Sequence, residues 1–138
     1  MPRQLQLGVL DQVPVPEGMT APEALRETIA LAQLTDGLGY VRYWLAEHHN
    51  HPGLASPAPE VLIPAIAAAT GRIRVGSGGV MLPHYSPLHV AEQFRVLEAL
   101  YPAASIWALA VRRAATRTPR WRSTRTRIPT SSRTRCRT

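Results

Sequence analysis

The sequence predicts an α/β fold with parallel strands, because three strand-like segments alternate with amphipathic helical segments. The strand-like segments begin near residues 5, 40 and 73, so they are spaced about 35 and 33 residues apart, with one helix in each interval. Successive βα units place helices outside a parallel sheet, in either a closed barrel or an open doubly wound sheet. The repeat by itself leaves both architectures open.

The first half of the chain carries clear local signals. Residues 5–10 first alternate between apolar and other side chains and then become continuously apolar, as in a strand that becomes buried. Asp11 ends this run. Residues 20–23 read Thr-Ala-Pro-Glu, a capping-box spacing that predicts the start of a helix. Residues 40–46 are rich in aromatic and β-branched types and predict a second strand, which ends at the polar run 47–50.

The same reading continues to residue 102. A second helix is expected over 59–69 and is ended by Gly71, and a third strand is expected over 73–83. Ser86-Pro87 opens a third helix, and Pro102 would stop it.

The charge is divided unevenly along the chain. Residues 1–102 hold all nine acidic residues and six arginines, whereas residues 103–138 hold ten arginines and no acid, so the net charge of +7 comes from the tail alone. Such a tail could be an arm that binds nucleic acid through phosphate contacts.

Other composition features exclude several classes of protein. The only cysteine, Cys136, has no partner in the chain, so neither a disulfide framework nor a cysteine-based metal site is expected. No apolar run reaches the roughly 18 residues of a membrane helix, and the amino terminus lacks the apolar core of a secretory signal. We therefore expect a cytoplasmic protein without membrane contact.

Polar residues follow each predicted strand, where the carboxyl ends of parallel strands bind ligands. They are Asp11, the run from Glu47 to Asn50, and Ser77-Gly78-Gly79. His48 is the candidate acid/base, because imidazole titrates near neutral pH. The alternative is that adjacent loop histidines are merely solvated.

Two further features of these strand ends are open to more than one interpretation. Glu47-His48-His49 could suggest a metal site, but adjacent side chains diverge and no third ligand follows at helical spacing, so no metal is expected. Gly78-Gly79 indicates either a bulge, a simple kink or close approach of a planar ligand. His84 and Tyr85 could line the same pocket or lie on the surface.

Four segments together resemble the bacterial luciferase-like monooxygenases. They are Trp-Leu-Ala-Glu-His-His at 44–49, Val-Gly-Ser-Gly-Gly-Val-Met-Leu-Pro at 75–83, Ala-Ser-Pro-Ala-Pro-Glu at 55–60 and Ala-Glu-Gln-Phe at 91–94. The resemblance covers residues 5–102 and implies about three of the eight βα units of a TIM-type barrel.

The resemblance also implies a chemistry. Members of the family bind reduced FMN, or in some cases a deazaflavin, react the flavin with oxygen at C4a and transfer one oxygen atom to a small organic substrate. A flavin reductase is a possible partner, and full-length relatives are expected to be homo-oligomers. The resemblance assigns acid/base chemistry to His48 and places Gly78-Gly79, often joined by a cis peptide, against the isoalloxazine ring. We expect Ser77, Glu47 and His49 to contribute to the same cofactor site.

The resemblance stops at Pro102. Family members continue with Gly-Arg-(Ile/Val)-Asp-Leu-Gly, whereas this chain continues with Ala-Ala-Ser-Ile-Trp-Ala. With codons that these amino acids allow, restoring one base after Pro102 recovers Gly-Arg-Val-Asp-Leu-Gly-Leu-Gly-Arg-Ala-Pro-Gly. We therefore predict a partial luciferase-like barrel domain over 1–102 and a frameshifted, disordered, Arg-rich tail over 103–138, and favour this over a nucleic-acid-binding arm. An inert barrel remnant is a further alternative.

Overall fold

Strands and helices alternate along the chain as the sequence predicted. The computed structural model describes residues 5–102 and 105–110. The elements are β1 (Gly8–Asp11), α1 (Ala21–Gly37), β2 (Arg42–Leu45), α2 (Pro59–Ala69), β3 (Arg74–Met81), a 3₁₀ turn η1 (Leu82–His84), α3 (Pro87–Leu100) and β4 (Ser105–Ala110). The predicted second helix has the observed bounds, and the other helices and the first three strands are confirmed with ends that differ by a few residues.

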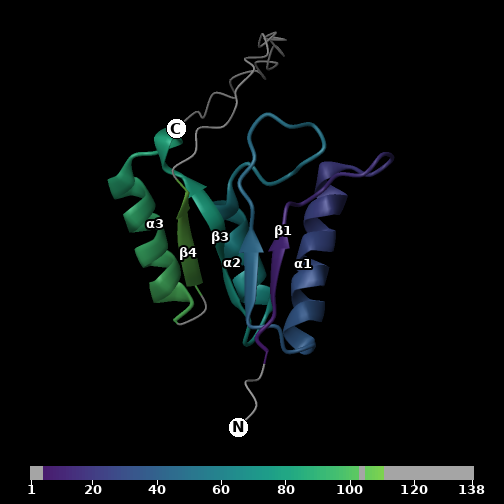
Figure 1. Cartoon of the computed structure of the whole chain (residues 1–138), viewed down its shortest axis with the longest axis horizontal. Coiled ribbons are helices and arrows are strands. Elements are labelled where there is room, and N and C mark those ends of the chain that lie inside the picture. Colours follow the sequence, from purple (N-terminus) through teal and green to yellow (C-terminus); the bar gives the residue numbers. More distant parts are fainter. Residues whose placement is uncertain (1–4, 103–104, 111–138) are drawn as a thin grey trace, which may run out of the picture.

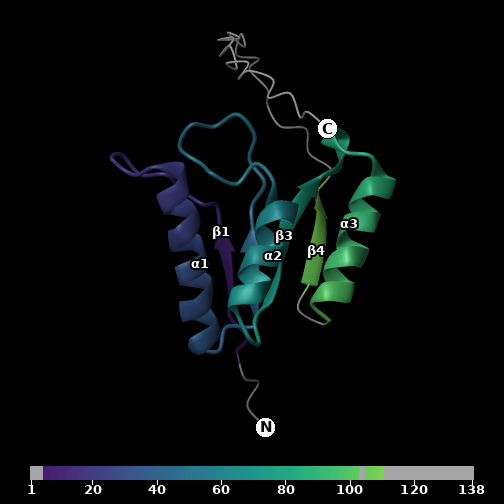
Figure 2. The same cartoon turned by 180° about the vertical axis from the view of Figure 1, so that it is seen from behind.

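The four strands form one parallel sheet in the order β1-β2-β3-β4. Asp11 pairs with Leu45, and Leu45 pairs with Ser77, so the carboxyl ends of β1, β2 and the middle of β3 lie at the same level. In Figure 1 α2 lies behind the sheet, and in the opposite view of Figure 2 it lies in front; in both views α1 is near β1 and α3 is near β4. This is the α/β fold of an open barrel segment.

The expectation that disorder begins at residue 103 is wrong for residues 105–110. Ser105–Ala110 forms β4, which pairs in parallel with β3 from Val75 to Met81. The physical reason is that β3 would otherwise present an unpaired edge, and the short, mostly apolar run after α3 is the next segment able to pair with it. The remainder of the predicted tail lies outside the described residues.

The core lies between the sheet and the helices. Tyr43, Leu45 and Val75 from the strands pack with Ile63 and Ile66 from α2, and all five side chains are fully or almost fully buried. Burial of each large apolar side chain contributes about 1.5–3 kcal/mol. The opposite face of the sheet is much more open.

Two acidic residues shape the ends of α1. Glu23 accepts a hydrogen bond from the backbone N–H of Thr20 at 2.7 Å, which confirms the predicted capping box. Asp36, near the other end, accepts the backbone N–H groups of Gly71, Arg72 and Ile73 at 2.7, 3.1 and 2.8 Å. The hydrogen bond from Gly71 is the main reason that the pKa of Asp36 is lowered. These bonds fix the turn that leads from α2 into β3.

No helix within the described residues is long and apolar enough to cross a membrane.

Candidate functional site

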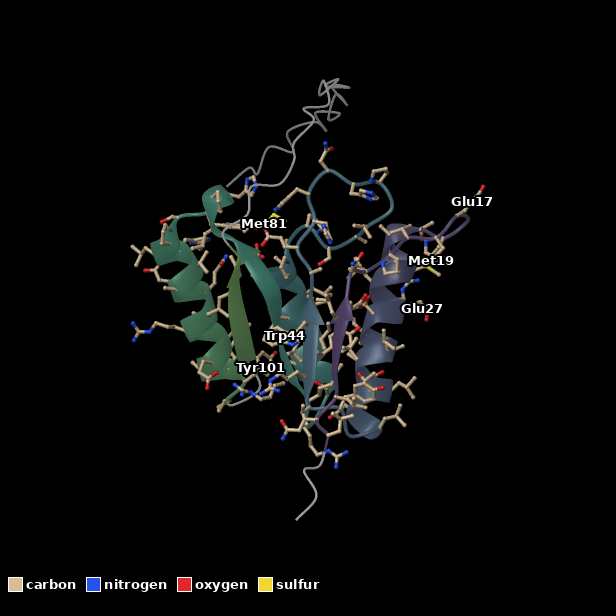
Figure 3. All side chains as sticks on the ribbon, viewed as in Figure 1. Glu17, Met19, Glu27, Trp44, Met81 and Tyr101 are labelled. Atoms are coloured by element: carbon tan, nitrogen blue, oxygen red, sulfur yellow. The ribbon has the colours of Figure 1, made fainter. Side chains whose placement is uncertain are left out.

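The carboxyl ends of β1, β2 and β3 form one edge, as the sequence analysis expected. The loop after β2, residues 46–58, rises above this edge, and Figure 3 shows Met81 there, well above Trp44 on β2. Three groups of polar residues reach this edge, but the structure gives them different roles.

Asp11 is committed to the fold. Its side chain is buried and accepts hydrogen bonds from the Val13 backbone N–H at 2.7 Å, the Thr28 hydroxyl at 2.7 Å and the Tyr43 hydroxyl at 2.6 Å. Burial is the main cause of the raised pKa of Tyr43, and the bond to Asp11 adds to it. Asp11 therefore joins β1, α1 and β2 rather than facing a ligand.

Glu47 is equally enclosed, but its partners belong to the strand-end region. Oε1 accepts a hydrogen bond from the Tyr85 hydroxyl at 2.9 Å and lies 2.6 Å from Nε2 of His49, while Oε2 accepts the Met81 backbone N–H at 2.8 Å. Glu47 is only 3% exposed. With both oxygens occupied, the carboxylate is suited to positioning its neighbours, and direct contact between Glu47 and a cofactor has no support in this geometry.

The sequence does not show whether His84 and Tyr85 line the pocket or lie on the surface. The structure brings both to the site: Tyr85 donates to Glu47, and the ring of the exposed His84 lies 5.1 Å from the ring of His49. Burial is the largest cause of the raised pKa of Tyr85, followed by its bond to Glu47. No spacing signal identifies these pairs, because they join loops that are more than 30 residues apart.

His48 differs from both of its neighbours. Its backbone N–H donates to the Ser56 carbonyl at 3.0 Å, so the main chain is held, and its side chain is half-buried. Within the described part of the chain no hydrogen bond to the His48 imidazole is found, whereas His49 is engaged by Glu47. The structure thus leaves one imidazole of the Glu-His-His run free to meet a ligand.

Ser77 does not face the same side as Gly78. Its side chain is 1% exposed and lines a small cavity beneath α2 and α3. Successive side chains of a strand point to opposite faces, so Ser77 is turned toward the helices while Gly78 faces the open side. The expectation that Ser77 contacts the cofactor is therefore not supported.

Gly78 and Gly79 are joined by a cis peptide bond, as the resemblance implied. The register of β3 against β4 shifts between Gly78 and Val80, which agrees with either the bulge or the kink among the alternatives from the sequence. A Cβ atom at position 78 would lie 2.9 Å from the Trp44 Cβ and 3.4 Å from Leu10 Cδ1, so packing against Trp44 already requires glycine at this position. The glycine at 78 is explained without any ligand.

A small cavity and a larger groove lie elsewhere on the described part of the chain, and neither is lined by His48 or Gly78. The cavity below Ser77 has a volume of about 10 Å³. A groove of about 400 Å³ is lined by residues of α2 and α3, including Pro64 and Leu100. Among the described residues, no group of three or more His, Cys, Asp or Glu residues could hold a metal ion. The candidate site is the open surface at the strand ends.

Comparison with known proteins identifies the family. The model of the family described as luciferase-like monooxygenase matches residues 5–103. The uncharacterised protein YwcH of Bacillus subtilis is 61% identical over 98 residues, which cover 71% of this chain and 29% of that protein. The chain therefore spans less than a third of the length of this relative.

Two solved structures agree. Apo-MsnO8 superposes with a TM-score of 0.74 at 55% identity, over 75% of this chain and 32% of that one. The oxygenating constituent of 3,6-diketocamphane monooxygenase from Pseudomonas putida, a type II Baeyer–Villiger enzyme solved with FMN, gives a TM-score of 0.73 at 22% identity, over 78% of this chain and 30% of that one; at this identity it shows the shared fold. The fold is thus part of a TIM-type barrel, and the chain belongs to the luciferase-like monooxygenase family.

Proposed function

We propose that this chain is the amino-terminal part of a cytoplasmic, flavin-dependent monooxygenase that uses reduced FMN and oxygen on a small organic substrate. The observation that carries the proposal is the geometry of the Glu-His-His run. Glu47 and His49 are paired with each other, while His48 is held by its main chain and keeps a free imidazole at the strand ends. An anchored backbone with an available side chain is the arrangement that proton transfer to a bound ligand requires.

The residues present fit one side of a flavin ring. Leu10 and Trp44 lie against Gly78 on the open face of the sheet, and Leu10 is 58% exposed. Sites that bind cofactors are lined mainly by apolar side chains with a few polar groups, and these residues together with His48 would supply one wall of such a site. A bound reduced flavin would supply the electrons that activate oxygen. A deazaflavin would fit the same surface, so FMN is our first proposal and a deazaflavin the alternative.

Each residue of the run has a distinct part in this proposal. His48 gives or takes the proton at its imidazole. Glu47 acts through others: it holds His49, Tyr85 and the Met81 backbone, and so joins the loop after β2 to the end of β3. Gly78 and Gly79 would lie beside the ring through their backbone atoms, because neither glycine has a side chain of its own, and Leu10 and Trp44 would border them.

We expect the 138-residue chain alone to be inactive, since TIM-barrel enzymes take phosphate-binding groups from later strands. The test therefore begins by sequencing the gene from codon 95 onward, because we propose that one base is missing near codon 103. A continuation into further βα units supports that proposal, and its absence contradicts it.

The catalytic test uses the restored reading frame with reduced FMN, oxygen and a panel of organic substrates. His48→Ala should reduce oxygen transfer by about 10²–10⁴-fold, the usual effect of losing a general acid or base. His89→Gln, at an exposed position on α3, is the matched control and should leave the rate unchanged. Equal rates for wild type and His48→Ala would overturn the assignment of His48. Binding of reduced deazaflavin in preference to FMN would select the alternative cofactor.

A further inference from the structure

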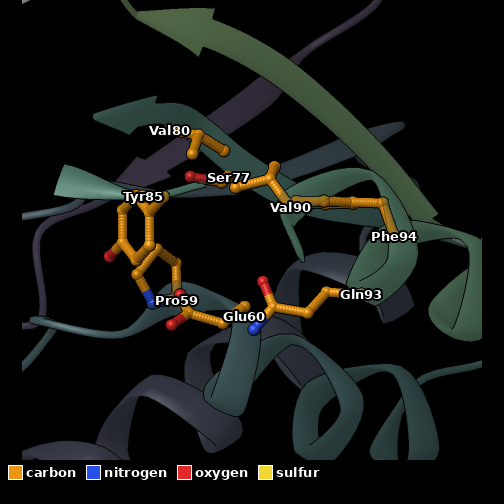
Figure 4. Close-up of a pocket in the computed structure, with 8 residues that line it drawn as sticks. All are labelled: Pro59, Glu60, Ser77, Val80, Tyr85, Val90, Gln93 and Phe94. Atoms are coloured by element: carbon orange, nitrogen blue, oxygen red, sulfur yellow. The ribbon is translucent and has the colours of Figure 1, made fainter. Parts of the chain in front are cut away.

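A small cavity lies on the helix side of β3, away from the candidate cofactor surface. Its volume is about 10 Å³, and it lies where α2 and α3 meet the strand (Figure 4). It is lined by Pro59, Glu60, Ser77, Val80, Tyr85, Val90, Gln93 and Phe94. The lining combines an apolar wall with a few polar side chains from three elements.

The hydroxyl of Ser77 is the unusual group in this cavity. Its Oγ atom is completely enclosed and has no hydrogen-bond partner within the described part of the chain. Buried hydroxyls nearly always have a partner, because an unpaired one loses the hydrogen bonds that it made in water. Ser56 shows the ordinary situation, since its buried hydroxyl donates to the Ala46 carbonyl at 2.7 Å. The Ser77 hydroxyl therefore indicates a missing partner.

The size and chemistry of the cavity define that partner. A volume of roughly 10–15 Å³ accommodates one water molecule, and a buried water needs two to four polar neighbours. Figure 4 shows the side chains of Glu60 and Gln93 across the cavity from Ser77. Together these residues offer a carboxyl group, an amide and a hydroxyl, which is the set that a buried water requires, and the space is too small for any organic ligand.

We propose that this cavity is a binding site for a single water molecule, held by Ser77 on β3, Glu60 on α2 and Gln93 on α3. The water completes the hydrogen bonds of Ser77 and joins the strand to both helices immediately before Gly78. The three residues come from three of the segments that carry the family resemblance, yet the proposed chemistry uses none of the three side chains. The proposal is independent of flavin binding.

The first experiment compares two buried serines in the full chain, by thermal unfolding in trimethylamine N-oxide, which favours the folded state. Ser56→Ala removes a hydroxyl with a protein partner and must lower the Tm. If a water is bound, Ser77→Ala also removes a hydrogen bond and should lower the Tm by roughly 4–8 °C, the usual effect for a domain of this size. If the cavity is dry, Ser77→Ala removes an unpaired buried group and should raise the Tm, which would overturn the proposal.

A second measurement does not depend on the variants folding. In a high-resolution crystal structure of the unmodified chain, we expect an ordered water within about 3.2 Å of Ser77 Oγ and within hydrogen-bond distance of Glu60 or Gln93. An empty cavity would overturn the proposal, and so would a Ser77 hydroxyl that donates directly to a protein carbonyl.

Discussion

The two faces of the sheet are built differently. On the helix side, Tyr43, Leu45 and Val75 are fully buried against α1 and α2, and Asp11 has a partner for each oxygen. On the other side, Leu10 is 58% exposed and Trp44 is only half-buried. The first face has the packing of a finished domain, whereas the second is a surface that a closed barrel would cover.

The difference between the two faces reflects how far apart in sequence their covering elements lie. Each helix covers the helix side as soon as its own βα unit forms, because the covering element follows directly in sequence. The open side can be covered only by strands that close the barrel, and within the described residues β1 and β4 each have a single neighbour.

The largest effect concerns the 138-residue chain studied by itself. An open apolar face and the outer edges of β1 and β4, which have no neighbouring strand among the described residues, favour association between chains. Without trimethylamine N-oxide, we expect broad unfolding and concentration-dependent aggregation, measured by circular dichroism and light scattering. A sharp, cooperative transition of a monomer would show that the open face is stable without a cover.

A matched pair of core truncations compares the two faces directly. Ile66→Ala removes a fully buried side chain from α2 and should cost about 2–5 kcal/mol. Leu10→Ala, on the open face, should change stability by less than about 0.5 kcal/mol. Urea unfolding in trimethylamine N-oxide measures both. Equal losses would mean that Leu10 is covered in solution.

A matched pair of glycine substitutions examines the one close approach on the open face. Gly78→Ala places a Cβ atom 2.9 Å from that of Trp44 and should cost about 1–3 kcal/mol. Gly37→Ala, at the end of α1, meets nothing within 4 Å and should be neutral or slightly stabilising. The same unfolding assay measures both, and a tolerated Gly78→Ala would show that Trp44 moves freely.

The smallest effect is the pH dependence from Asp36. The pKa of Asp36 in the folded state lies below the ordinary value of an aspartate, so its contribution to stability is present above that ordinary pKa and is lost as the pH falls through the lower, folded pKa. Asp36→Asn should lower stability by about 1 kcal/mol at pH 7, and this difference from the wild type should shrink below about pH 4. Denaturation at pH 7 and pH 3 measures it. A difference that is independent of pH would contradict the role of the charged carboxylate.

The candidate site could be predicted only in part from the sequence. Residue type and position at a strand end identified His48 and Glu47, and the structure brings both to the expected edge. The sequence could not reveal that both carboxylate oxygens of Glu47 have partners in His49, Tyr85 and Met81, because these contacts join two segments that are distant in sequence. The sequence also could not show that the Ser77 side chain is buried on the helix side, since a position next to Gly78 in sequence is on the opposite face of a strand.

Hydrophobic periodicity, capping residues and motif segments are local properties of the chain, so they were enough to predict the order of strands and helices, the parallel sheet and the family. Three other features could be seen only in the folded chain. Ser105–Ala110 joined the sheet because β3 offered an unpaired edge, Trp44 determined that position 78 must be glycine, and Ser77 was enclosed with Glu60 and Gln93. Each depends on which segments distant in sequence come into contact, and such contacts exist only once the sheet and helices have packed together.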